Sequence, residues 1–498
     1  MKAGRYVTAL FAAVVSVALA PGARAGTAVP PGYRLEAEEQ VTTGVQHERL
    51  VRDEPPLVVN VARIAPDAPI SFRAVLSNEQ VAGPAPRLER TSSMCARVHC
   101  LLATNGDFAA VGSEAPIGGL VTGGQLLRSP STTHHQLSVT QDGRLSAGSF
   151  EWSGKLMPTD LQPISLAGVN VAVPQNQVVL YTPAFGPSTG TRGPGASLVV
   201  RNVEPAGALR LGQTTMVELV AVGDDGGDRP IPADGAVLVG HGQGAEALRR
   251  LWGRVQSGAA SAKAFLRLET PGGVVESLGG TPILLRDGKR WYADANDDFT
   301  RGRHPRTIVG WTPGGEVLLV TVDGREPGRS VGMTLAEATD FMGSIGATEA
   351  INLDGGGSTT FVTNGTVLNQ PSDVAVRRGG DEVIVHSARP GDDVLGHVER
   401  PVASALTVVA SKEVAAPSTA PPAGASLGLP QALTAVAPAS SDPGSVPDGG
   451  LAAVASAGAR DFGRQVRVGA VAANVSVAVA LGVWMAGRRR RARFAGSP

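Results

Sequence analysis

One long segment near the C-terminus limits what this chain can fold into. Residues 389–465 are rich in alanine, proline, serine, glycine and valine, with few charges and no sustained hydrophobic periodicity. Such a composition buries too little apolar surface to offset the entropy lost when a backbone becomes ordered. We therefore expect a semi-extended spacer there, stiffened by its prolines, and a folded region that lies before it.

Both ends of the chain carry patterns typical of export and membrane anchoring. Residues 1–25 have a basic start, a short apolar run and small residues at 23 and 25, as in a cleaved signal peptide. Residues 466–487 are mostly apolar and match the length of a membrane-spanning helix, and residues 488–498 are rich in arginine. Because arginines beside an apolar span stay in the cytoplasm, we expect a single-pass cell-membrane protein with its folded part outside. The alternatives are an uncleaved anchor at the first end and a buried hydrophobic helix at the second.

The composition argues against nucleic acid as a partner and suggests a disulfide. The formal net charge of the 498 residues is zero, so there is no electrostatic case for binding nucleic acid. The two cysteines, Cys95 and Cys100, predict a disulfide in an oxidising compartment. A metal site is less favoured because His99 is the one neighbouring ligand, and a catalytic thiol is the least favoured reading.

The pattern of apolar runs predicts many strands and few helices. After an N-terminal leader at residues 26–94, short apolar runs separated by glycine and aspartate turns continue through residues 95–388. One clear helix begins at a capping box formed by Thr334 and Glu337. We expect an α+β fold, with a largely antiparallel or mixed sheet packed with a few helices in a single main domain.

The strongest candidate for chemistry is a run of glycines after an apolar strand. Glycines let backbone amides approach a ligand closely, and successive amides can form a nest that binds an anion. A tight β-turn is the plainer alternative, but a carboxylate before the glycines and hydroxyls after them favour a functional role. Asp354 could act as a base or a nucleophile, and an anion could be held by Gly355, Gly356, Gly357, Ser358 and Thr359.

Charged residues flank two further predicted strands. Arg306 precedes the strand at 307–311, and Asp323 and Arg325 follow the strand at 317–322. If these strands form an antiparallel hairpin, the three side chains lie near one end of it, where arginines could bind phosphate oxygens in bidentate fashion. The alternatives are solvated surface charges and an ordinary turn.

Three further groups of polar residues complete the candidates. Asn105 and Asp107 lie at another strand end beside a glycine, where both residue types are common turn formers. The doublet His134-His135 is a weak metal candidate because neighbours on a strand point to opposite faces. No cofactor is certain, although exposed aspartate and asparagine oxygens could hold calcium.

Several of these segments together resemble the phosphodiester glycosidase family, which includes the uncovering enzyme of mammalian lysosomes. The resemblance covers about residues 95–388, and its motifs occur in the family's order at residues 103–108, 180–186, 279–284, 304–310, 322–325, 332–335 and 352–358.

The resemblance implies a hydrolase that cuts the bond between a sugar C1 and a phosphate. We expect Asp354, Asp323 and Asn105 to be catalytic, and the substrate-binding residues to include Arg306, Arg325, His304 and Asp107. A sugar-phosphate glycan on a bacterial cell surface would be the substrate. Three alternatives stay open: a non-catalytic binder of phosphorylated cell-envelope glycans, an adhesion protein on a stalk, and a hydrolase that attacks phosphorus.

Overall fold

The computed structural model describes residues 29–411 apart from residues 83–87, 111–112, 131–133, 160, 379, 387–388 and 390. The expected signal peptide, membrane helix and arginine-rich tail lie outside the described residues, as does most of the expected spacer. Within the described ranges, none of the helices combines the length and the apolar character needed to cross a bilayer.

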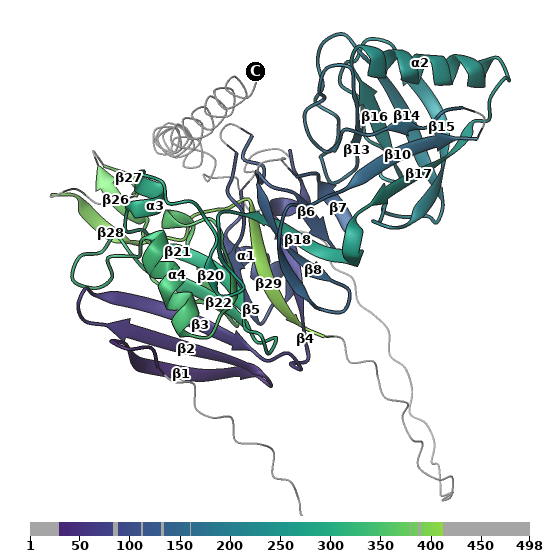
Figure 1. Ribbon diagram of the computed structural model, residues 1–498. Coiled ribbons are helices and arrows are strands. Elements are labelled where there is room, and N and C mark those ends of the chain that lie inside the picture. The colour runs from purple at the N-terminus through teal and green to yellow at the C-terminus, as the bar shows by residue number, and fades with distance from the viewer. Residues whose placement is uncertain are drawn as a thin grey trace, which may run out of the picture.

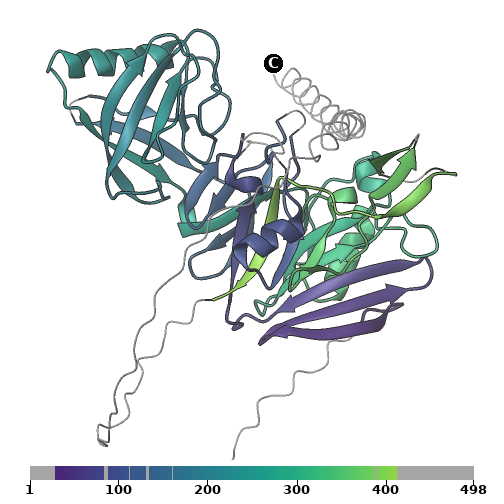
Figure 2. The same cartoon turned by 180° about the vertical axis from the view of Figure 1, so that it is seen from behind.

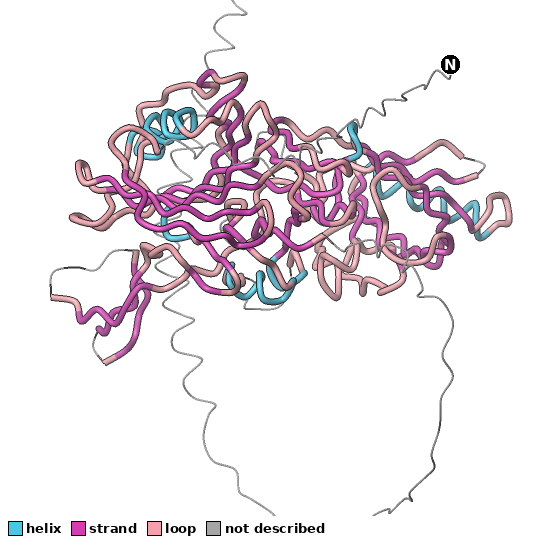
Figure 3. The backbone as a smooth tube through the Cα atoms, turned by 90° about the horizontal axis from the view of Figure 1, so that it is seen from below, coloured by secondary structure: helices cyan, strands magenta, loops and turns pink. Residues whose placement is uncertain are grey.

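The described chain is mainly β, so the predicted α+β class is wrong. It contains 29 strands in five sheets and four α-helices, and the strands dominate the backbone trace (Figure 3). The helices are short and form no continuous layer, and much of the core lies between sheets instead. The helices are α1 (Thr91–Val98), α2 (Gln243–Gln256), α3 (Asp298–Arg301) and α4 (Leu335–Ser344).

The largest sheet joins distant parts of the chain. The residues expected to form a leader supply its first three strands, which pair with the strands that carry the charged motifs. Its eight strands, in spatial order, are β1 (Arg34–Thr42), β2 (Val45–Arg52), β3 (Leu57–Ile64), β22 (Val317–Val322), β21 (Arg306–Trp311), β23 (Glu349–Asn352), β19 (Ile283–Arg286) and β20 (Lys289–Arg290).

Both faces of this sheet are covered, which explains the continuous apolar runs of its central strands. Every residue of β3 and of β22 is buried. Helix α4 packs on one face, and the predicted capping box between Thr334 and Glu337 at its start is confirmed. A strand buried on both faces is expected to be apolar throughout rather than alternating.

A second sheet contains a strand from the segment expected to be a spacer. Strand β29 lies between β4 and β5 and pairs with both (Figure 1), so the spacer prediction is wrong for residues 393–411. The disulfide between Cys95 and Cys100, with a Cα–Cα distance of 4.9 Å, links the end of α1 to the start of this sheet. The five strands, in order, are β25 (Thr366–Val367), β24 (Phe361–Thr363), β5 (Leu102–Asn105), β29 (Ser404–Ala410) and β4 (Ile70–Leu76).

A separate eight-stranded sheet has its own hydrophobic core and is covered by α2. It lies to one side of the other sheets (Figures 1 and 2), and its core includes Leu198, Leu238 and Leu248. In spatial order its strands are β11 (Ile164–Ser165), β10 (Ser153–Pro158), β17 (Lys263–Glu269), β15 (Thr214–Gly223), β14 (Ala196–Glu204), β16 (Gly235–Gly240), β13 (Val178–Tyr181) and β12 (Gly168–Val169).

Two small sheets complete the fold. The chain enters and leaves the separate sheet through the first of them, whose strands are β7 (Gln125–Arg128), β6 (Leu120–Thr122), β18 (Val274–Gly280), β8 (His135–Thr140) and β9 (Leu145–Gly148). The second projects from the molecule (Figure 1) and consists of β27 (Asp381–Val385), β26 (Val374–Arg378) and β28 (Asp393–His397).

The position of β29 leads to a stability prediction. Leu406 is 2% exposed in the middle of this strand, so Leu406→Ala should lower the free energy of unfolding by about 2–5 kcal/mol. Val394→Ala on the projecting strand β28, where the side chain is 49% exposed, should change it by less than about 0.5 kcal/mol. Urea denaturation measures both, and equal small effects would mean that β29 is not part of the core.

Candidate active site

Loops from three different strands meet at Asp354. The amide of Asp354, just after β23, donates to the carbonyl of Gly106 at 3.0 Å, just after β5. The amide of Gly356 donates to the carbonyl of Pro305 at 2.9 Å, immediately before β21. The glycine turn is therefore fixed to two neighbouring loops.

The buried side chain of Asn105 holds these loops together. Its side chain is fully buried, and Nδ2 donates to the carbonyl of Asp354 at 2.7 Å. Its Oδ1 accepts from the Thr307 hydroxyl at 2.7 Å and from the Thr360 amide at 3.2 Å. Because the side chain is fully buried and its bonds join the loops, Asn105 positions the loops and does not contact a sugar hydroxyl.

The Asp354 carboxyl group is half-buried and holds its proton unusually well. Burial raises its pKa to about 6, and the nearby negative charge of Asp107 acts in the same direction. Hydrogen bonds from Ser358 and from the Gly355 amide, together with the charge of Arg400, oppose this increase. A carboxyl group with such a pKa can exchange a proton near neutral pH, as a general base must.

Asp107 lies beside Asp354 and is held by three donors. It is 1% exposed and accepts from the amides of Phe108 at 2.8 Å and Gly118 at 2.6 Å, and it lies 2.9 Å from His134 Nε2. No local sequence pattern indicates this role of His134, because the residue is distant from Asp107 in the chain and belongs to a histidine doublet in a polar loop.

Because three glycines of the turn lack side chains, two arginines and a backbone carbonyl can lie close to it. A Cβ at Gly355 would lie 2.7 Å from the carbonyl oxygen of Pro305, and one at Gly356 would lie 2.8 Å from the Arg325 guanidinium. At Gly357 it would lie 2.1 Å from Arg400. The amides of Gly355 and Gly356 donate within the protein, so positive charge at this turn comes mainly from the two guanidinium groups.

Arg325 reaches this turn through an unusual backbone conformation. Its φ is 63°, in the left-handed region, and its Nη1 lies 3.4 Å from the Ser372 hydroxyl. Desolvation of its guanidinium and the nearby charge of Arg400 lower the pKa of Arg325, and Asp354 is close enough to oppose this change. The structure therefore brings Arg325 and Asp354 together, as expected.

Arg400 belongs to the site although it was assigned to the spacer. Its guanidinium binds both oxygens of Asp373, at 2.7 and 2.9 Å, and contacts His386 at 2.6 Å. Asp373 is 1% exposed, and despite its burial the bonds from His386 and Arg400 hold its pKa below the ordinary range. Such a bidentate pair fixes the arginine firmly against the glycine turn.

Arg306 supports the candidate active site by holding a neighbouring loop in place. Strands β21 and β22 form the predicted antiparallel hairpin, with Arg306 opposite Val322. Arg306 is 2% exposed, donates to the carbonyls of Met333, Phe299 and Gly302, and has a pKa lowered to about 10 by burial. These bonds hold the loop around α3, so the side chain supports the loop that carries Phe299.

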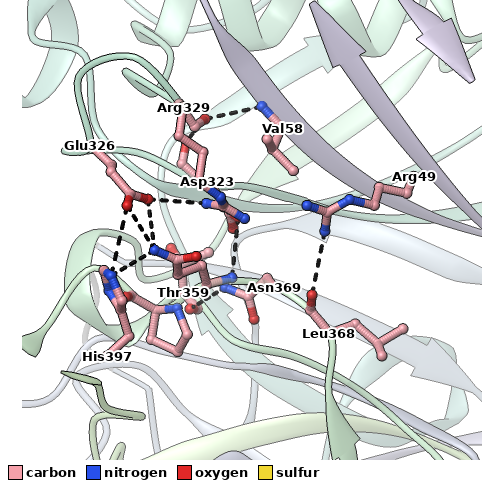
Figure 4. Close-up of polar contacts among 12 residues, drawn as sticks. Arg49, Val58, Asp323, Glu326, Arg329, Thr359, Leu368, Asn369 and His397 are labelled. Carbon is pink, nitrogen blue, oxygen red and sulfur yellow. Dashed lines mark hydrogen bonds and ion pairs between the residues drawn. The ribbon is translucent and has the colours of Figure 1, made fainter. Parts of the chain in front are cut away.

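Asp323 has its own set of partners, although it contacts the same segment, residues 370–372, as Arg325. It is 1% exposed, forms an ion pair with Arg329 at 2.9 Å and accepts from the Gln370 amide at 3.2 Å (Figure 4). Burial raises its pKa in spite of Arg329. Asp323 thus belongs to a polar network with Glu326 and is not among the groups that act on Asp354.

The remaining candidates have structural partners. His304 Nε2 lies 2.9 Å from the carbonyl of Asp298, and Thr359 is buried, with its carbonyl accepting from Asn369 at 3.0 Å. In the described ranges, no group of three or more His, Cys, Asp or Glu side chains is arranged to hold a metal ion.

Sequence comparisons with known proteins cover the residues of this site. Residues 220–409, which include Asp354 and both arginines, match the phosphodiester glycosidase family model. The N-acetylglucosamine-1-phosphodiester alpha-N-acetylglucosaminidases of Bos taurus and Homo sapiens are 34% and 33% identical over 119 residues. These stretches cover 21% of this chain and 22% and 23% of the relatives, so the chain matches about a fifth of their length.

Solved structures share the fold. A hypothetical protein from Synechocystis aligns with a TM-score of 0.54 at 19% identity, over 76% of this chain and 68% of that one. A putative exported protein from Burkholderia pseudomallei aligns with a TM-score of 0.51 at 23% identity, over 71% and 74%. The resemblance of the chain to the phosphodiester glycosidase family is confirmed.

The spacing at Gly357 gives a prediction about stability. Gly357→Ala places a methyl group 2.1 Å from Arg400 Nη2 and 2.2 Å from Asp373 Oδ1, so it should lower the free energy of unfolding by about 1–3 kcal/mol. Gly343→Ala inside α4, where no atom lies within 4 Å of the new methyl group, should raise it by about 0.5–1 kcal/mol. Chemical denaturation of both variants tests this, and an unchanged Gly357→Ala would mean that the packed arrangement is absent in solution.

The pKa of Asp354 gives a prediction about pH. Because the folded-state pKa of about 6 lies above the ordinary value, this group stabilises the fold at low pH, and the contribution is lost as pH rises through 6. Asp354→Asn should therefore be more stable than the wild type at pH 8, by up to about 3 kcal/mol, and equally stable near pH 3.5. Thermal unfolding at the two pH values measures the difference, with Asp67→Asn on an exposed turn as the control. A stability difference that does not depend on pH would contradict the assignment.

Proposed function

We propose that this chain, which carries a phosphodiester glycosidase domain in residues 220–409, hydrolyses the bond between a sugar C1 and a phosphate. The observation that carries the proposal is the half-buried Asp354, with a pKa near 6, beside two guanidinium groups at a glycine turn. Such a site offers a proton acceptor next to fixed positive charge, which is the combination that this reaction needs.

The arginines would bind the phosphate. Arg325 and Arg400 flank the glycine turn, and Arg400 is already fixed by its two bonds to Asp373. Charge that develops on the leaving phosphate as the C1–O bond breaks would be stabilised by groups that need no rearrangement. A phosphate monoester is a stable leaving group, so protonation of the leaving oxygen matters less than in ordinary glycosidases.

Asp354 would act at C1. As a base, its ionised carboxylate takes a proton from water while the water oxygen bonds to C1 and the phosphate leaves with the electrons of the C1–O bond. As a nucleophile, the same carboxylate would bond to C1 while the phosphate leaves with the electrons of the C1–O bond. Water would then attack C1 and break the bond between C1 and the carboxylate. Both routes need the ionised form, so the rate should increase as pH rises through about 6.

The aromatic rings near Asp107 would place the sugar. The ring of Phe108 lies 6.2 Å from that of Phe299 and 5.9 Å from that of His134. Asp107 is 1% exposed and held by three donors, so it would position Phe108 and His134 rather than contact the sugar. Apolar ring faces suit the C–H groups that a sugar ring presents.

We also propose that the domain acts outside the cell. The basis is the signal-like sequence at residues 1–25 and the apolar and basic sequence at 466–498. The disulfide between Cys95 and Cys100 supports this location, because disulfides persist in oxidising compartments.

A product assay with the full-length protein tests the reaction. With UDP-N-acetylglucosamine as the substrate, the proposal predicts free sugar and intact UDP, with oxygen from labelled water in the sugar. Asp354→Asn should lower kcat/KM by at least about 10²-fold, whereas the exposed Asp142→Asn should not change it.

The other outcomes separate the rival functions. Release of sugar 1-phosphate would show attack at phosphorus and overturn the proposal. Tight binding of the diester without any product would favour a non-catalytic glycan-binding role.

A further inference from the structure

We propose that the β19–β20 hairpin and the loop that follows it form a second subsite, which binds the continuing chain of a polymeric sugar phosphodiester. This inference rests on the proposed function and specifies its substrate class. The hairpin region contains three pairs of an arginine and an aromatic ring, and these pairs lead from the loop beside the candidate active site to an exposed tryptophan.

The three pairs have similar geometry. The guanidinium carbon lies 5.3 Å from the ring centre in the pair of Arg306 with Phe299, 5.5 Å in the pair of Arg290 with Tyr292, and 4.5 Å in the pair of Arg286 with Trp291. Phe299 also contacts Phe108, next to Asp107, with ring centres 6.2 Å apart. The first pair therefore reaches the candidate active site.

The outermost pair is exposed and held in place. Trp291 is 53% exposed, so its ring is accessible to a ligand. Arg286 is fixed by a 2.6 Å bond from Nη2 to the carbonyl of Ala147, in addition to its contact with the ring. An arginine held in this way loses little entropy when it binds an anion.

The register of the sheet gives the distance to Asp354. The Trp291 amide donates to the carbonyl of Leu284, and the neighbouring residue Ile283 lies opposite Ile351. Asp354 follows Ile351 by three residues, so Trp291 lies roughly 10 Å from Asp354 along the strands and two strand spacings of ~4.8 Å across them. More than one sugar unit is needed to span such a distance.

The hairpin is accessible and basic. Strand β20 is the last strand of its sheet and lies beside α4 (Figure 1), to which Arg290 is linked by an ion pair with Asp340 at 3.8 Å. The turn itself carries Arg286, Lys289 and Arg290 against one carboxylate, Asp287, whereas the loop that follows adds Asp294, Asp297 and Asp298 against Arg301. The positive charge therefore lies at the hairpin beside Trp291, where it favours an anionic ligand.

A sugar-phosphate chain has the chemistry that this row of pairs would recognise. Its sugar rings present C–H faces that can lie on aromatic rings, and its phosphates are bound by guanidinium groups in bidentate fashion. Sugars and phosphates alternate along such a chain, and at the hairpin Trp291 and Tyr292 each lie against an arginine. A neutral glycan would leave Arg286 and Arg290 with only the protein contacts that they already make.

The test compares a long and a short substrate on the full-length protein. The substrates are an oligomer of N-acetylglucosamine joined by 1-phosphodiester links and the single diester UDP-N-acetylglucosamine, and the readout is the ratio of their kcat/KM values. Trp291→Ala should lower this ratio about tenfold through KM for the oligomer, the loss expected from one stacked ring. Phe265→Ala, which removes a 42% exposed ring from β17 in the separate sheet, should leave the ratio unchanged.

The outcomes separate this inference from the proposed function. An unchanged ratio in Trp291→Ala, or an equal loss with both substrates, would overturn the subsite, since the ring would then only protect the sheet edge or support the fold. If the wild type cleaves neither substrate, the proposed reaction fails, and calorimetric binding of the oligomer becomes the readout. Weaker binding by Trp291→Ala than by Phe265→Ala would then support the subsite, and equal binding would overturn it.

Discussion

The arrangement of the candidate active site depends on one buried amide group. The side chain of Asn105 joins the carbonyl of Asp354 to the Thr307 hydroxyl and the Thr360 amide, and so connects three segments that are distant in the chain. An amide carries donors and an acceptor on one planar group, so a single residue can bind both kinds of partner. In a fully buried position each such bond is costly to break, which makes the junction rigid. The orientation of Asp354 follows from this rigidity.

The same region concentrates charge in a way that folding alone would not favour. Asp354, Asp107 and Asp373 gather near Arg325 and Arg400, and Arg325 adopts a left-handed backbone conformation to reach them. Buried charges and strained residues reduce stability and persist where the surrounding structure enforces them. The sheets provide this support for Asp107, Arg325 and Asp354, because each of these residues follows a strand that is buried or nearly so.

Local sequence patterns located the parts of the site but not their orientation. Asp354 and Asp107 were identified because each lies beside a glycine after an apolar strand, and the capping box of α4 was read correctly from Thr334 and Glu337. Arg306, Asp323 and Arg325 were expected near one end of a hairpin. The hairpin forms, but Arg306 is held by carbonyls around α3 and Asp323 by Arg329, whereas Arg325 reaches the glycine turn.

Errors of a second kind came from contacts between distant residues. Strand β29 has the valine and alanine content of the spacer that follows it, and its pairing with β4 and β5 cannot be read from its own residues. The α+β prediction failed for a related reason. The apolar runs were assigned to a single sheet packed with helices, but they form strands of several sheets.

The pairing of β29 has a mechanical consequence. The strand is bonded to β4 along its length and to β5 over its middle, and both neighbours are antiparallel to it. Tension applied along the strand at Ala410 would be shared by many hydrogen bonds, which must break together. An opposite arrangement, with the strand at an edge and pulled sideways, would open one bond at a time. The fold thus resists tension applied along this strand.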